Sequence, residues 1–174
     1  MSQLASRIRL LAAALLVVSS AVLADDACAA FTWNVSHERA LFATSARELA
    51  AGRDAATAPV VDPDRLYDLA LAPHDEVHMP AMNRTAHGAG QGSAGLVRLQ
   101  ITAAGSYRIS VGAQMWVDVV SGSMLIASSD FAGQHGCEAP HKIVQYDLQP
   151  GTFILQLSGA AADHVKMTVT RPPA

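Results

Sequence analysis

The chain has 174 residues, which is enough for one domain with a substantial apolar core. It carries 12 basic and 15 acidic residues, with only two lysines and no basic cluster. Because phosphate groups are bound by clustered positive charge, this composition argues against a nucleic-acid partner and against an anionic membrane surface.

Residues 1–24 are typical of a secretory signal peptide. Two arginines form a basic start, an apolar run from Leu10 to Leu23 follows, and small side chains precede a cleavage point after Ala24. The run is too short to predict a membrane span, although a retained anchor is the alternative. Cleavage predicts a periplasmic or secreted chain of residues 25–174, with 10 basic against 15 acidic residues and a formal charge of −5.

The two cysteines, Cys28 and Cys137, are expected to form a disulfide, because cysteines of an exported chain usually pair. A lipid anchor on Cys28 is disfavoured, since the acidic Asp25 stands three places upstream, where lipid processing requires an apolar residue. The alternative is cleavage after the cysteine of "ACA", which would remove Cys28 and leave Cys137 free.

The stretch Val35 to Arg53 is the one region with helical features. Ser36 is placed to cap a helix, Glu38 suits a first turn, and Gly52 suits an end. The apolar residues fit a helical face only loosely, so part of the stretch is also compatible with an extended chain. A loop rich in Ala, Asp and Pro follows.

The stretch "PHDEVHMP", residues 73–80, predicts a solvated loop leading into an edge strand. On a strand His74 and His78 share a face, but at about 3.3 Å per residue they lie roughly 13 Å apart, too far for one ion. The flanking prolines disfavour a helix, which would bring the two rings together. The alternative is a metal site of His74, His78 and His87, holding iron or zinc, or copper with help from nearby Met79 and Met82.

From Arg65 onward, apolar and polar residues alternate with the period of strands that bury one face. In "SYRISV", for example, Tyr107 and Ile109 share one face, and Arg108 and Ser110 share the other. About eight such strands, joined by short Gly and Pro turns, predict an all-β protein. We expect a single antiparallel β-sandwich, jelly-roll-like, over residues 25–174, with a short N-terminal helical segment after the signal peptide.

The region from Gly95 to Thr170 resembles the bacterial pre-peptidase C-terminal (PPC-like) β-sandwich. It has a strand, a Gly turn, a second strand, an Asp-bearing strand with a Gly turn, and a strand entry of the form L-x-x-G-x-[YF]. The residues that fill these positions are Asp118, Gly122, Leu148, Gly151 and Phe153. The resemblance implies a non-catalytic exported module that aids binding or secretion. Such modules usually accompany a protease or hydrolase domain, whereas residues 25–174 are expected to form a single domain.

Trp116 and Asp118 are the candidate ligand-binding residues, because they share one face of a strand. An aromatic ring and an acid on an outward face can bind a sugar by stacking and hydrogen bonding. The alternative is a core tryptophan with an aspartate that caps a turn. In the loop from Ser128 to Lys142, Cys137 and two histidines could bind zinc, but a disulfide at Cys137 would remove that role.

No motif in the chain specifies a reaction: it has no G-x-S-x-G elbow and no glycine-rich phosphate loop. The sequence predicts an exported, non-catalytic binding or accessory module with no cofactor. Its partner is expected to be a protein, peptide or carbohydrate. The alternatives are a metal-dependent enzyme, such as a non-haem iron dioxygenase, and a periplasmic copper- or zinc-binding protein.

Overall fold

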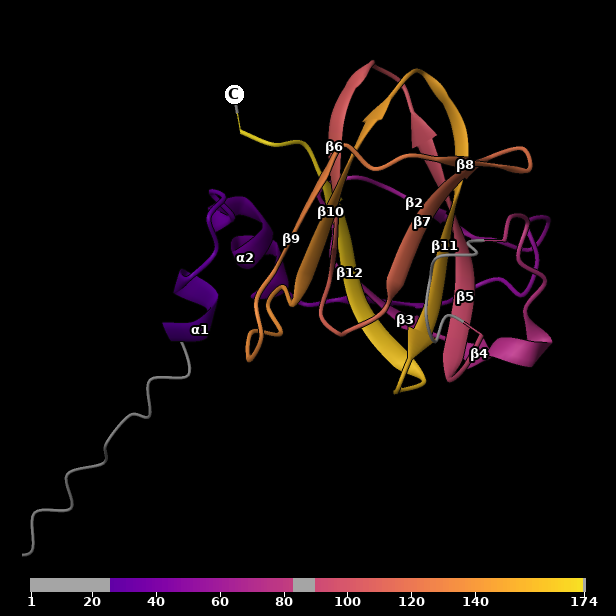
Figure 1. The fold of residues 1–174 in the computed structure, drawn as a ribbon, viewed down its shortest axis with the longest axis horizontal. Coiled ribbons are helices and arrows are strands. Elements are labelled where there is room, and N and C mark those ends of the chain that lie inside the picture. Colours follow the sequence, from indigo (N-terminus) through magenta and orange to yellow (C-terminus); the bar gives the residue numbers. More distant parts are fainter. Residues whose placement is uncertain (1–25, 83–89, 174) are drawn as a thin grey trace, which may run out of the picture.

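The computed structural model describes residues 26–82 and 90–173, and it is an all-β sandwich of two mixed sheets (Figure 1). The expected fold class is confirmed. The expected signal peptide and His87 lie outside the described residues.

The first sheet, sheet A, has the strand order β1-β3-β12-β6-β10-β9. The bounds of these strands are β1 Arg47–Ala50, β3 Tyr67–Ala70, β12 His164–Thr170, β6 Gly105–Val111, β10 Lys142–Leu148 and β9 Asp130–Gly133. All pairs in this sheet are antiparallel except β1 with β3, which run parallel.

The second sheet, sheet B, has the order β2-β5-β11-β7-β8, with β4 also paired to β5. The bounds are β2 Val60–Val61, β5 Ser93–Ile101, β11 Gly151–Ala160, β7 Trp116–Ser121, β8 Met124–Ile126 and β4 Ala72–Pro73. The pair β2 and β5 is parallel. The two parallel pairs depart from the purely antiparallel sandwich that the sequence predicts, and both involve short strands from the N-terminal half.

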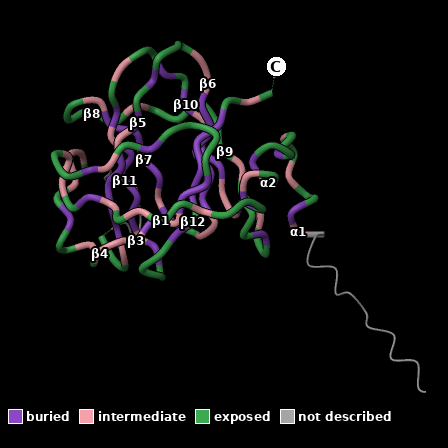
Figure 2. Tube along the Cα trace, turned by 180° about the vertical axis from the view of Figure 1, so that it is seen from behind, coloured by how far each residue is buried: buried purple, intermediate pink, exposed green. Residues whose placement is uncertain are grey.

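The main core lies between the sheets, where alternate residues of the long strands meet. Leu99, Ile109, Leu155 and Leu157 are completely buried there. Figure 2 shows that buried positions run along the strands and exposed positions along the connections. The alternation read from the sequence therefore correctly identified the inward face.

The helical segment is shorter than expected. Helix α1 spans Asp26–Ala29 and helix α2 spans Ser36–Phe42. Residues 47–50 are extended, which the sequence had left open for part of this stretch, and they form strand β1 by pairing with β3 along the edge of sheet A. The cap also differs from expectation: the Asn34 side-chain oxygen accepts the Ser36 N–H at 3.1 Å. Gly52 forms an isolated bridge with Leu96 and does not end a helix. No helix among residues 26–82 and 90–173 is long and apolar enough to cross a membrane.

The outer face of sheet B is covered by the chain between β1 and β5. A small second core forms there from Ala58, Val77, Ala94 and Leu96, with Met79 packed against it. The covering chain is fastened to β11, since the Gln156 side-chain oxygen accepts the Ala81 N–H at 2.8 Å. The stretch "PHDEVHMP" belongs to this cover.

Candidate functional site

A hollow of about 570 Å³, here called the edge hollow, lies where β7 and β8 of sheet B face β9 and β10 of sheet A. Its volume falls within the range of small-molecule sites, about 300–1,000 Å³. Apolar side chains form most of its wall: Val117, Leu125, Ile126, Phe131 and Val144. Phe131 is 69% exposed, so this ring is presented to solvent at the rim.

The edge hollow exists because β8 is too short to cover β7. The register pairs Val119, Val120 and Ser121 of β7 with β8. The first half of β7, from Trp116 to Asp118, pairs with β11 on its other side. The two sheets are therefore open to each other along this half of β7.

Two side chains of β10 reach across this opening to the backbone of β7 and of the residue before it. The Tyr146 hydroxyl donates to the Val117 carbonyl at 2.8 Å, and the Lys142 ammonium donates to the Met115 carbonyl at 3.1 Å. The ammonium also lies 5.0 Å from the centre of the Trp116 ring, which is a cation–π contact. These contacts satisfy backbone acceptors at a strand edge that lacks a strand neighbour.

Burial changes the proton affinity of both groups. It lowers the pKa of Lys142 from the ordinary value of 10.5, and the Asp118 carboxylate offsets this only in part. Burial, followed by the negative charge of Asp118, raises the pKa of Tyr146 well above 10.0. The edge hollow is therefore partly shielded from water, and the Asp118 carboxylate lies close enough to Lys142 and Tyr146 to raise the pKa of both.

Both expected ligand-binding residues, Trp116 and Asp118, line the edge hollow. The sequence reading missed Lys142, Tyr146 and Phe131. A signal for two of them was available, because the alternation in "KIVQYDL" sets Lys142 and Tyr146 on one face of a strand.

Replacing Tyr146 with phenylalanine is expected to lower the free energy of unfolding at pH 7 by about 1–3 kcal/mol, since the buried Val117 carbonyl loses its donor. The difference should shrink above pH 10. A tyrosine with a raised folded-state pKa stabilises fully below its unfolded pKa and loses that contribution as the pH climbs toward the folded one. Urea unfolding of both proteins from pH 7 to 11 measures this. A difference that stays constant or grows above pH 10 would contradict it.

The stretch "PHDEVHMP" forms the loop that we expected, but its short strand, β4, ends at Pro73 and so precedes the loop rather than following it. Residues His74–Glu76 form a 3-10 turn, closed by the Val77 N–H donating to the His74 carbonyl at 3.1 Å. Within residues 26–82 and 90–173, no three His, Cys, Asp or Glu side chains gather closely enough to hold a metal ion. The site of His74, His78 and His87 stays a prediction, because His87 lies outside these ranges. Element analysis of the purified protein checks it.

The loop before β10 is fixed by a disulfide between Cys28 and Cys137, whose Cα atoms lie 5.0 Å apart. This is the pairing expected from the sequence, and it leaves no thiolate at Cys137 for the alternative zinc site. The ring of His141 contacts the Cys137 carbonyl at 3.0 Å and meets His135 edge-on. These residues therefore shape the loop around the disulfide.

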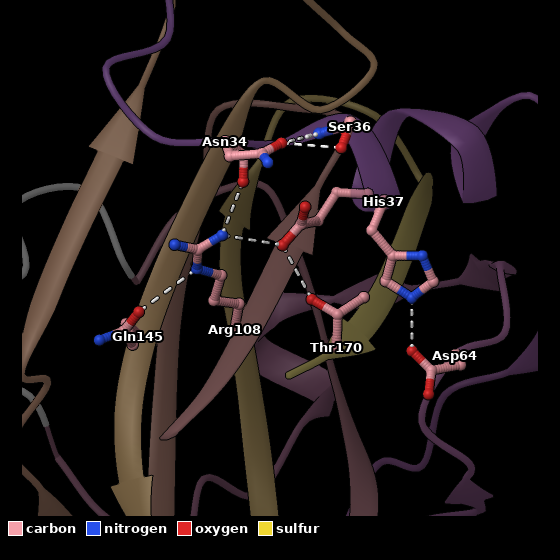
Figure 3. Close-up of polar contacts among 8 residues, drawn as sticks. Asn34, Ser36, His37, Asp64, Arg108, Gln145 and Thr170 are labelled. Carbon is pink, nitrogen blue, oxygen red and sulfur yellow. Dashed lines mark hydrogen bonds and ion pairs between the residues drawn. The ribbon is translucent and has the colours of Figure 1, made fainter. Parts of the chain in front are cut away.

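A buried polar cluster lies between α2 and the outer face of sheet A (Figure 3). Arg108 donates to the Asn34 carbonyl at 2.9 Å and lies 3.4 Å from the Glu38 carboxylate. Thr170 donates to the same carboxylate oxygen at 2.9 Å. The guanidinium stacks over the Trp33 ring at 4.6 Å. The cluster holds α2 and the residues just before it against the sheet, and the second Glu38 oxygen, Oε2, is buried there with no hydrogen-bond partner among the described residues.

Comparison with known proteins assigns no family to the chain and finds only weak likenesses of fold. No family model and no curated protein match the chain. Several solved structures are similar to it, and two of them are a collagenase domain and a β-glucosidase. The pre-peptidase C-terminal domain of a collagenase from Bacillus anthracis is 9% identical, with a TM-score of 0.35, over 72% of this chain and 94% of that one. A β-glucosidase from Paenibacillus barengoltzii is 10% identical, with a TM-score of 0.29, over 71% of this chain and 13% of that one. The expected resemblance to the PPC-like sandwich is therefore a weak likeness of fold.

Proposed function

We propose that the protein is an exported, non-catalytic binding module, and that the edge hollow is its binding site. The observation that carries this proposal is the combination of volume and lining: an opening of about 570 Å³ walled by apolar side chains, with a few polar groups at fixed positions. This combination is typical of sites that bury a small ligand or an apolar side chain of a partner.

Two polar groups of the edge hollow are already hydrogen-bonded, which leaves the apolar wall as the main source of binding free energy. Tyr146 and Lys142 already donate to backbone carbonyls, so a ligand gains most from the area that it buries against Leu125, Ile126 and Phe131. Burial of apolar area contributes about 25 cal/mol per Å² before the costs of association.

A fluorescent probe tests the site directly. N-phenyl-1-naphthylamine, an uncharged apolar fluorophore, is expected to bind with increased emission. Leu125→Asp places a charge on the apolar wall and should weaken binding at least about tenfold. Met124→Asp is the matched control, because Met124 lies on the same strand, is 69% exposed and does not line the edge hollow. Equal binding by both variants and the wild type would refute the proposal.

Export is supported by the basic and apolar start of the sequence and by the disulfide between Cys28 and Cys137. Intact-mass measurement of the protein recovered from the periplasm or medium is expected to show the loss of residues 1–24. A mass that retains those residues would contradict cleavage after Ala24, and recovery only from the cytoplasm would contradict export.

A further inference from the structure

Two hollows meet at Trp116 and Lys142. The edge hollow lies on one side, and a second hollow of about 610 Å³ lies on the other. The second hollow is lined by small residues and by the amides of Gln91 and Gln114. Lys142 therefore stands at the junction of an apolar compartment and a more polar one.

The positive charge of the Lys142 ammonium is only partly balanced by the groups around it. Among the described residues it makes one hydrogen bond, to the neutral Met115 carbonyl, and it faces the Trp116 ring. Asp118 on β7 is its acidic neighbour, yet burial outweighs that carboxylate and the pKa of Lys142 stays lowered. A further negative group at the junction would stabilise the charged lysine.

The apolar wall and the lysine together indicate the chemistry of a ligand. An apolar chain or ring against Leu125, Ile126 and Phe131 leaves water, while a head group at the junction reaches Lys142. A carboxylate there would accept charge-assisted hydrogen bonds from an ammonium that has donors to spare. A cationic head would be repelled, and an uncharged head would gain only the burial of its chain.

We propose that the edge hollow binds a monocarboxylate with an apolar body, of the class of medium-chain fatty acids, with its carboxylate paired to Lys142. This inference rests on the proposed function of the edge hollow. It adds the charge of the ligand and the residue that recognises it.

Three eight-carbon probes that differ in head group test the proposal on the wild-type protein. Octanoate, octanol and octylammonium are titrated at pH 7.5 by calorimetry or by displacement of N-phenyl-1-naphthylamine. Octanoate is expected to bind about ten- to a hundredfold more tightly than octanol, as hydrogen bonds to charged groups predict. Octylammonium should bind most weakly. Hexanoate should bind more weakly than octanoate, by about fourfold for each CH₂ removed.

Variants assign the effect to one residue. Lys142→Met should reduce octanoate binding to the level of octanol, and Lys142→Arg should keep part of the preference. Lys166→Met is the matched control, because Lys166 is the other lysine, lies exposed on β12 and does not line the edge hollow. If Lys142→Met fails to fold, the three probes on the wild type still test carboxylate recognition, and a preference unchanged in Lys142→Arg would count against a direct pairing with Lys142.

The outcomes separate the two proposals. Equal binding of octanoate and octanol would overturn carboxylate recognition and leave the apolar site in place. An octanoate preference that survives in a folded Lys142→Met variant would overturn the role of Lys142. If neither the eight-carbon probes nor the fluorophore binds, the proposed function itself fails.

Discussion

Replacing Arg108 with methionine is expected to lower the free energy of unfolding by about 3–5 kcal/mol. Glu38 is completely buried, and the Arg108 guanidinium is its cationic partner at 3.4 Å. Without the guanidinium, the carboxylate must stay buried uncompensated or take up a proton. The Asn34 carbonyl and the Trp33 ring lose their contacts with the guanidinium at the same time.

The double variant Glu38→Met with Arg108→Met is the control for this effect. Removing both charges leaves an apolar interface of similar volume, so the double variant should be more stable than Arg108→Met alone. Urea unfolding followed by circular dichroism measures both. A loss below about 1 kcal/mol for Arg108→Met would mean that the pair does not hold α2 against the sheet.

Removing the disulfide by replacing Cys28 and Cys137 with serine is expected to cost about 5 kcal/mol. The bridge joins residues 109 positions apart. In the chain-entropy model, a bridge across so long a loop greatly lowers the conformational entropy of the unfolded chain, and its removal restores that entropy and so favours unfolding. Both cysteines are buried, so the serine hydroxyls add a desolvation cost. Denaturation midpoints with and without a reductant measure the effect.

Adding a reductant to both proteins is the control. A reductant should lower the midpoint of the wild-type protein and leave that of the variant unchanged. If the wild type shows one midpoint under both conditions, either the bridge is absent or it contributes nothing, and the expectation is wrong.

The strands were predictable because one face of each is buried between the sheets. The alternation in β6 set Tyr107, Ile109 and Val111 inward, and the structure buries all three. The same alternation set Arg108 and Ser110 outward as polar residues, but they too are buried, because α2 and the residues before it pack over that face. A local pattern carries no information about which distant segment covers a sheet.

The candidate site was likewise predictable where it depends on one strand, and not where it depends on contacts between the sheets. Strand periodicity placed Trp116 and Asp118 together, and both line the edge hollow. Their neighbours Lys142 and Tyr146 come from the other sheet, and only the docking of the two sheets brings them close. The sequence left residues 47–50 open between helix and extended chain, and pairing with β3 makes them a strand. Residues 74–76 lie in the predicted loop, but the short strand β4 precedes that loop instead of following it.

Strand β12 is the last strand of the described chain, yet it lies inside sheet A between β3 and β6. The sheet therefore cannot assemble in the order in which the chain emerges during synthesis or translocation. Until residues 164–170 have emerged, β3 and β6 present unpaired edges that can join other chains. We expect chains stopped before this strand to aggregate, and the folding of sheet A to wait until residues 164–170 have emerged.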